Sequence, residues 1–221
     1  MSADADRLPA IGCLNVGAFR ASLISTTGFH CEVWRISGSL IRDSEKLPLD
    51  MVVKHHLEPA SWGDVRVLRK EYGMLRRALG AMVPTAIFVR SEVQGEPNVI
   101  VLARAVRPWF NLANPVNESD TIPLLRRMRQ TREQLGRFIH AAHRWREQEG
   151  LVLDLYGLDN LVLDIDHKIR YVDSFRVFFY EDLLHILDET DPGLKERIDL
   201  SRVRLDYLRH LHRQATIRCI T

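Results

Sequence analysis

The stretch NLVLDIDHKIRYVD, residues 160–173, decides our interpretation of the fold. Two short apolar runs flank a polar turn in this stretch, a pattern that predicts a β-hairpin. In a symmetric hairpin centred between Asp166 and His167, opposing residues have numbers that sum to 333. Asn160 and Asp173 meet that sum, so we expect them to face each other at the open end, with Cβ atoms roughly 5 Å apart.

An amide and a carboxylate placed in this way are hard oxygen ligands. Mg²⁺ is usually held by one or two carboxylates together with substrate phosphates. The hairpin therefore predicts a metal–phosphate site at Asn160 and Asp173. The alternative is that Asn160 only begins a strand and Asp173 only ends one, as these residue types often do.

The chain before the hairpin changes character near residue 106. Its first part predicts strands at 19–26, 31–37, 49–55, 86–93 and 99–105, a polar loop at 38–46 and one helix at 64–79. The apolar stripe expected on that helix consists of Val67, Leu68, Tyr72, Leu75 and Leu79.

The second part is rich in helical patterns. It predicts a linker at 107–117, a long helix at 122–148, the hairpin, and helical segments at 181–187 and 200–214. Strands and helices are thus segregated along the chain, which predicts an α+β fold rather than a doubly wound sheet. We expect two lobes, a strand-rich one at 1–106 and a helical one at 107–221 that contains the hairpin.

Two charged residues in the first part lie where the pattern predicts burial. Lys54 stands near the end of a predicted strand, and Glu71 lies on the predicted helix that follows. A buried charge is costly unless it has a partner, so a Lys54–Glu71 pair is one interpretation. A surface lysine and a solvated glutamate are the alternative.

The order of these features resembles that of the protein-kinase-like superfamily over roughly residues 19–185. The tract Lys70-Glu71-Tyr72-Gly73-Met74-Leu75-Arg76-Arg77, followed by Val83-Pro84, resembles small-molecule kinases such as aminoglycoside phosphotransferases. The compact second part resembles the small bacterial kinase-like proteins of the PhoP regulatory network. The resemblance implies a compact two-lobed fold that binds ATP and Mg²⁺.

Residue by residue, the resemblance implies four matches. Lys54 corresponds to the family's strand lysine and Glu71 to its helix partner, while Asn160 and Asp173 correspond to the two metal ligands. The catalytic base stands five positions before the asparagine in the family motif, and here that position is a leucine. Asp154, six positions before Asn160, is the candidate base.

Nucleotide contacts follow from the same resemblance. Thr26, Thr27 and Gly28 correspond to the phosphate loop, which has a single glycine here, and the adenine is expected near Ala103 and the residues up to 106. No segment ending in an APE-type motif follows Asp173. The resemblance therefore implies a small-molecule or glycan hydroxyl as the acceptor, rather than a protein.

Composition sets the outer limits. The chain has 221 residues, 46% of them hydrophobic, and a formal net charge of +2, which gives no general attraction to nucleic acid or membranes. No apolar run approaches the roughly 18 residues of a membrane span, and residues 1–9 do not resemble a signal peptide. The three scattered cysteines predict no disulfide framework, and we expect a cytoplasmic location.

The long helix carries a set of arginines that the resemblance does not explain: Arg126, Arg127, Arg129, Arg132, Arg137, Arg144 and Arg146. Interleaved glutamates favour a solvated face over a patch for anionic lipid, glycan phosphate or nucleic acid. His140 and His143 could form a metal pair, but packing or surface positions are favoured, since no third ligand is evident.

Three functions remain open at this stage. The first is an ATP-dependent phosphotransferase with Mg²⁺ held by Asn160 and Asp173. The second is a catalytically inactive pseudokinase that binds a nucleotide or a protein partner. The third, least supported by the near-neutral charge, is a regulatory protein that uses its arginine-rich helix on nucleic acid or an acidic partner.

Overall fold

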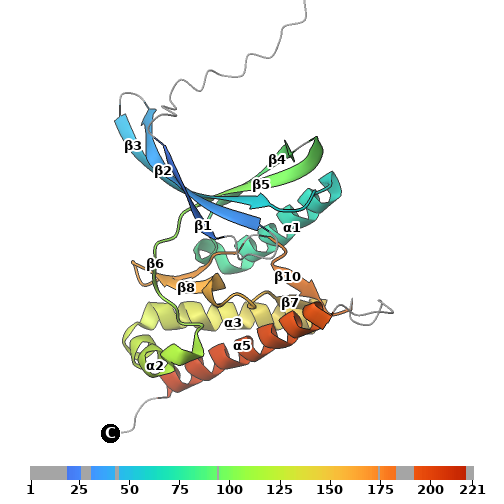
Figure 1. Ribbon diagram of the computed structural model, residues 1–221. Helices are drawn as coiled ribbons and strands as arrows, with labels where there is room; N and C mark the ends of the chain where they lie inside the picture. Colours follow the sequence, from blue (N-terminus) through green and yellow to red (C-terminus); the bar gives the residue numbers. More distant parts are fainter. Residues whose placement is uncertain are drawn as a thin grey trace, which may run out of the picture. The chain divides into compact units, whose positions relative to one another are not determined.

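The computed structural model describes residues 19–25, 31–42, 45–93, 95–173, 175–182 and 192–217. Packing divides the chain into two compact units, residues 1–62 with 86–105, and residues 63–85 with 106–221. An antiparallel sheet toward the N-terminus and helices toward the C-terminus make a mixed α/β structure (Figure 1). This arrangement of secondary structure is compatible with the expected kinase-like fold. The predicted bounds of the two lobes stay a prediction.

The first unit is built on a five-stranded antiparallel sheet in the order β1–β2–β3–β5–β4 (Figure 1). Its strands are β1 (Arg20–Ser25), β2 (Cys31–Arg42), β3 (Glu45–His56), β4 (Ala86–Val93) and β5 (Glu96–Arg104). Central β3 pairs on both sides, so Lys54 lies between Val33 of β2 and Val101 of β5. Lys54 is 8% exposed, which confirms its predicted burial.

The polar loop predicted at 38–46 is wrong for the residues described there. β2 continues to Arg42 and β3 begins at Glu45, with paired residues from Gly38↔Leu49 to Arg42↔Glu45. The end of this ladder is exposed at residues 45–48. An exposed ribbon has no buried face to impose an apolar–polar alternation, so its sequence resembles that of a loop.

The second unit begins with α1 (Trp62–Leu79), whose first residue belongs to the first unit, and the short turn η2 (Gly80–Met82). The elements that follow are β6 (Pro108–Phe110), η3 (Pro115–Asn117), α2 (Glu118–Arg127), α3 (Arg129–Glu149), β7 (Leu151–Leu153), η4 (Leu158–Asn160), β8 (Leu161–Asp164), β9 (Ile169–Tyr171), β10 (Phe178–Tyr180) and α5 (Pro192–Thr216). Two small antiparallel sheets, β6–β8–β9 and β10–β7, accompany the helices.

The single long helix predicted at 122–148 is two helices, broken at Met128 (φ −99°, ψ 83°). No glycine or proline marks the break. Instead, the Arg132 side chain donates from its Nη1 to the carbonyl oxygens of Leu125 and Arg126, at 3.2 and 3.1 Å. A side chain from the next helix thus satisfies carbonyls that would otherwise be left unpaired at the end of α2.

The hairpin is present, but its predicted register is wrong by one residue. Leu161 pairs with Tyr171 and Leu163 with Ile169, so paired numbers sum to 332 rather than 333. The turn is a three-residue loop, 165–167, closed by the Asp164 N–H donating to the Lys168 carbonyl at 3.0 Å. His167 takes a positive φ of 59°, which is typical of three-residue hairpin loops.

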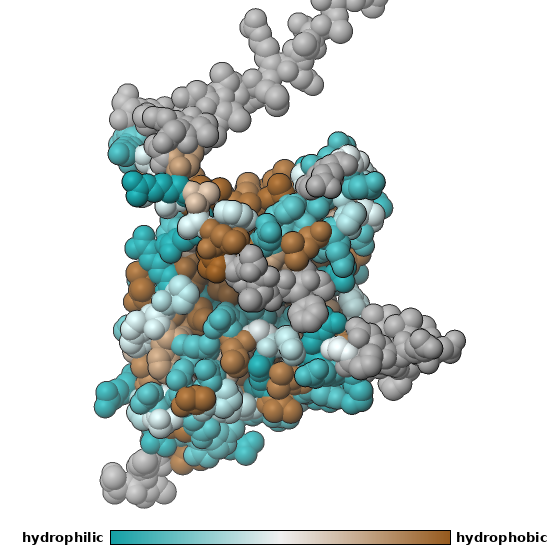
Figure 2. Space-filling model, viewed as in Figure 1, coloured by the Kyte–Doolittle hydropathy of each residue, from teal (hydrophilic) through white to brown (hydrophobic). Residues whose placement is uncertain are grey.

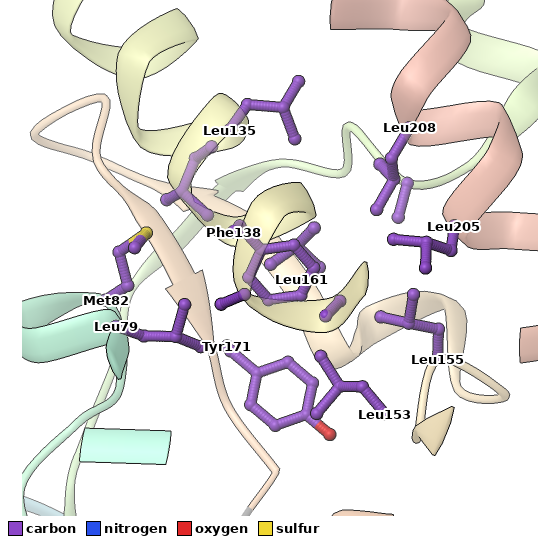
Figure 3. Packing of buried hydrophobic residues seen from close by; sticks show 14 of the residues in the cluster. Leu79, Met82, Leu135, Phe138, Leu153, Leu155, Leu161, Tyr171, Leu205 and Leu208 are labelled. Atoms are coloured by element: carbon purple, nitrogen blue, oxygen red, sulfur yellow. The ribbon is translucent and has the colours of Figure 1, made fainter. Parts of the chain in front are cut away.

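The core of the second unit lies between α3, the hairpin and α5, with the end of α1 at its edge. Figure 3 shows Phe138 of α3 and Leu161 of β8 at its centre, with Leu79 and Met82 on one side. Tyr171 of β9 is completely buried, and its ring lies 6.0 Å from that of Phe138. This core packs around β8, which begins directly after Asn160, and β9, which ends two residues before Asp173.

The remaining predictions concern the ends of the chain and the membrane. The helix predicted at 200–214 is confirmed within the longer α5. Residues 181–182 form a turn, and the rest of the helix predicted at 181–187 lies outside the described residues. In the described part of the chain, no helix combines the length and apolar character that crossing a membrane requires.

Candidate functional site

Asp154 follows directly after β7, and the protein holds its backbone from two sides. β7 pairs antiparallel with β10, Leu153 opposite Phe178. The Asp154 N–H then donates to the carbonyl of Val177 at 2.8 Å, and the next N–H, of Leu155, donates to Oγ of Ser201 on α5 at 3.1 Å. The candidate base therefore stands on a fixed segment of backbone.

The Asp154 carbonyl oxygen is a second anchor of this loop. It accepts hydrogen bonds from the Tyr171 hydroxyl at 2.9 Å and from Nδ2 of Asn160 at 3.4 Å. The amide of Asn160 is thereby oriented with its nitrogen toward Asp154. Its oxygen, the atom that can bind a cation, is left for another contact.

The Asp154 carboxyl group is partly buried and lies near another carboxylate. Its Oδ1 accepts from the Tyr156 N–H at 2.8 Å, while Oδ2 has no hydrogen-bond partner among the described residues. Burial, together with the negative charge of Asp173, raises the pKa of Asp154 to about 7. Opposing contributions to this pKa come from the Tyr156 hydrogen bond and from two α5 guanidinium groups, those of Arg197 and Arg204.

The structure brings Asn160 and Asp173 into the same neighbourhood, though they do not face each other as predicted. Asn160 instead lies opposite Val172, whose N–H donates to the Asn160 carbonyl at 2.9 Å. Asp173 comes one residue later, and its Oδ1 accepts from the Phe175 N–H at 3.3 Å. Because the charge of Asp173 acts on both Asp154 and Tyr171, the two carboxylates belong to one electrostatic cluster.

Gly157 leaves the space that Asn160 occupies. A Cβ atom on Gly157 would lie 2.6 Å from Oδ1 of Asn160 and 2.9 Å from its Cγ. Gly157 has ordinary extended backbone angles (φ −73°, ψ 121°), so its conformation does not require glycine. The close approach of the Asn160 amide is what makes a side chain here unfavourable.

Glu71 is a further carboxyl group of this unit that is buried, as is Asp164 of the hairpin. It lies on the buried stripe of α1, which is Val65, Leu68, Glu71, Leu75 and Leu79, whereas Val67 of the predicted stripe is 48% exposed. Its Oε1 accepts from the Tyr180 hydroxyl at 2.7 Å, and its buried Oε2 has no hydrogen-bond partner among the residues that the structure describes. Burial raises the pKa of Glu71, against the lowering effect of the bonds from Tyr180 and the Val177 N–H.

The other predicted nucleotide contacts lie elsewhere. Lys54 and Ala103 are buried residues of the first unit, on β3 and β5. Glu71 belongs to the second unit, so the Lys54–Glu71 pair stays a prediction. Thr26, Thr27 and Gly28 lie outside the described residues.

Sequence reasoning missed two tyrosines that support the site. Tyr171 bonds to Asp154, and Tyr180 bonds to Glu71. The signal for Tyr171 was present, because a tyrosine at a fully buried position needs a partner for its hydroxyl. Tyr180 gave no such signal, since its strand, β10, was not predicted.

The side chains of this site can hold a metal ion only together with ligands from outside the protein. In the described part of the chain, no group of three or more His, Cys, Asp or Glu residues could hold a metal ion by itself. The carboxylate of Asp173 and the amide oxygen of Asn160 suit a hard cation that completes its coordination with phosphate oxygens and water.

Comparison with known proteins adds little. No protein-family model matches the chain, and no curated protein matches it. Among solved structures, it is similar to a mutant of the PAN3 pseudokinase from Neurospora crassa, with 13% identity and a TM-score of 0.45. That match covers 96% of this chain and 53% of the other, so the chain spans about half the length of the protein it matches.

Proposed function

We propose that this protein is an ATP- and Mg²⁺-dependent phosphotransferase that acts on a hydroxyl group of a small molecule or glycan. The observation that carries the proposal is the pair Asp154 and Asp173, two carboxylates whose charges interact in a partly buried loop. Like charges brought together in this way are unfavourable unless a cation or a proton offsets them. In this proposal, a proton on Asp154 offsets the repulsion before the metal ion binds, and the bound cation offsets it afterwards.

Asp173 and Asn160 would hold the metal ion. The Asn160 amide is oriented by its Nδ2 contact with the Asp154 carbonyl, and Gly157 provides the space it needs. Bound Mg²⁺ would supply positive charge that neutralises and positions the phosphate oxygens of ATP.

Asp154 would act as the base toward the acceptor hydroxyl. A general base works best when its pKa lies near the working pH, and the pKa of Asp154 is raised to about 7. Its Oδ2 atom, which has no hydrogen-bond partner in the described part of the chain, would accept the hydroxyl proton. Tyr171, Val177 and Ser201 fix the backbone around it, so little reorganisation is needed.

The remaining roles rest on the family resemblance. Lys54 would contact the nucleotide phosphates and Glu71 would orient it, through the Oε2 atom that the described residues leave unpaired. The segment 26–28 would add phosphate contacts, and Ala103 would line the adenine position.

A pseudokinase that binds a nucleotide or a protein partner without catalysis is the second candidate. One observation favours it. The position five before Asn160, where the family motif has its base, is Leu155, and Asp154 stands one position further away.

Turnover measurements separate the two candidates. Purified protein is incubated with Mg-ATP and a panel of sugar, aminoglycoside and glycan acceptors, and ADP release is measured. The phosphotransferase proposal expects ADP release that Asp154→Asn lowers by roughly a hundredfold or more. The matched control is Asp166→Asn, an exposed carboxylate of the hairpin turn that should keep full activity. Nucleotide binding without ADP release above background would instead establish the pseudokinase.

A further inference from the structure

A groove between α3 and α5 lies outside the candidate site. Two adjoining hollows form it, with volumes of about 790 and 750 Å³, and both include Gly136, His140 and His212. We call it the α3–α5 groove. None of Asp154, Asn160 and Asp173 lines it.

Both walls of the groove carry cationic and imidazole side chains at helical spacing. Arg137, His140 and Arg144 come from α3, and Arg209, His212 and Arg213 come from α5. Residues three, four and seven apart lie on the same side of a helix. Arg137 and Arg144 line the first hollow, and Arg209 and Arg213 line the second, so each of the two adjoining hollows carries arginines of its own beside the shared His140 and His212.

The arginines of this groove differ from three other arginines of the same helical region. Arg126 and Arg132 bond to backbone carbonyls, and Arg129 pairs with Glu133 at 2.8 Å, so these guanidinium groups are engaged within the protein. The ion pair with Arg129 also neutralises the negative charge of Glu133, the acidic residue of the groove lining.

Three of the groove arginines have no such engagement. Within the described part of the chain, Arg137, Arg144 and Arg213 form no ion pair and no side-chain hydrogen bond. Arg209 forms only an exposed pair with Asp206, at 3.3 Å. The groove thus carries an excess of positive charge that the neighbouring residues do not neutralise.

Gly136 shows that the two helices fit each other closely here. A Cβ atom on Gly136 would lie 2.9 Å from Nε2 of His212, so the imidazole ring lies directly against the backbone of α3. Glycine inside a helix is unfavourable compared with alanine. Its presence in the middle of α3 allows His212 to form the shared floor of both hollows.

We propose that the α3–α5 groove binds a soluble small molecule that carries two or more phosphate groups. Guanidinium groups bind phosphate through paired, charge-assisted hydrogen bonds, and two adjoining hollows that each carry arginines suit a ligand with two or more phosphates. The volume of each hollow is in the range of small-molecule sites. Both hollows are shallow and open to solvent, and their arginines come from two different helices, so a compact soluble ligand can contact both helices at once. On the face that Figure 2 shows, the surface over α5 is mostly hydrophilic, with scattered hydrophobic residues.

The test is a calorimetric titration of the full chain with inorganic tripolyphosphate at physiological ionic strength. EDTA is present to remove divalent metal ions. The test variant is Arg137→Gln with Arg213→Gln, which removes one charge from each wall. The matched control is Arg66→Gln with Arg127→Gln, two exposed arginines outside the groove. All four residues are exposed, so the substitutions should leave folding intact.

We expect saturable binding that the groove variant weakens by about tenfold and the control variant leaves unchanged. Asp173→Ala should also leave it unchanged, because the groove does not depend on the proposed nucleotide site.

Equal affinity of the groove and control variants would overturn the proposal, and so would binding lost in Asp173→Ala. Equally tight binding of citrate would overturn the assignment to phosphate. Binding to phosphatidylserine vesicles that tripolyphosphate does not compete away would overturn the assignment to a soluble ligand.

Discussion

Replacing Asp154 by asparagine should stabilise the protein, and more so at high pH. The substitution keeps the shape of the side chain, and the amide oxygen can still accept from the Tyr156 N–H, whose bond to Oδ1 is 2.8 Å long. In the folded protein the pKa of Asp154 is raised from 3.8 to about 7. Folding therefore favours the protonated carboxyl, and this contribution to stability is present below pH 4 and lost as the pH rises to about 7.

The size of the effect follows from the shift in pKa. Roughly three pKa units correspond to a penalty of about 4 kcal/mol on the ionised form at high pH. About two fifths of this penalty is already present at pH 5, so a change from pH 5 to pH 8.5 isolates about 2.5 kcal/mol. Since Asp154 is partly exposed, we expect solvent screening to reduce this to about 2 kcal/mol.

Urea denaturation at the two pH values measures this difference. Tryptophan fluorescence can report the unfolding, because Trp145 is buried in the same unit as Asp154. The stability gained by Asp154→Asn should be larger at pH 8.5 than at pH 5 by about 2 kcal/mol. Asp173→Asn, which removes the neighbouring charge, should lower the pKa of Asp154 and shrink that difference. If Asp154→Asn changes the free energy of unfolding equally at both pH values, the raised pKa of Asp154 is refuted, and if Asp173→Asn leaves the difference unchanged, the interaction of the two carboxylates is refuted.

Two further predictions test the supports of the site. Tyr180→Phe removes the hydroxyl that donates to the buried Glu71, and we expect urea denaturation to show a loss of about 1–2 kcal/mol; no loss would mean that this bond is not formed. Gly157→Ala should displace the Asn160 amide and weaken Mg-ATP binding about tenfold, with the free energy of unfolding changed by less than about 1 kcal/mol. In an Asn160→Ala background the same change should have no effect on binding, and a further loss there would contradict the role of Gly157.

The strands of the sheet and the apolar helices could be predicted because their burial leaves a periodic pattern. β4 was predicted with its observed bounds, Ala86–Val93, since β-branched residues and a following turn mark it clearly. The break at Met128 was missed because no glycine or proline marks it, and the bonds from the Arg132 side chain to the carbonyls there are seen only in the structure. Short buried strands such as β7 and β10 were missed because three residues are too few to show a period.

The site shows the same division between local and tertiary information. The residue types Asn160 and Asp173 could be recognised from the hairpin, but the register could not. It depends on His167 adopting a positive φ, which makes the loop one residue longer than the symmetric turn that was assumed. The raised pKa of Asp154 could not be predicted either, because it comes from burial and from a carboxylate brought close by folding.

The clustering of Asp154, Asn160 and Asp173 as a metal–nucleotide site is tested most directly by one titration. ATP is added to the wild-type protein with and without Mg²⁺, and to Asp173→Ala and Asp166→Asn with Mg²⁺, and the heat of binding is measured. We predict Mg²⁺-dependent binding that Asp173→Ala weakens by at least about tenfold and that Asp166→Asn leaves unchanged. ATP binding that is absent, or that is equally tight without Mg²⁺ and in Asp173→Ala, would contradict this account.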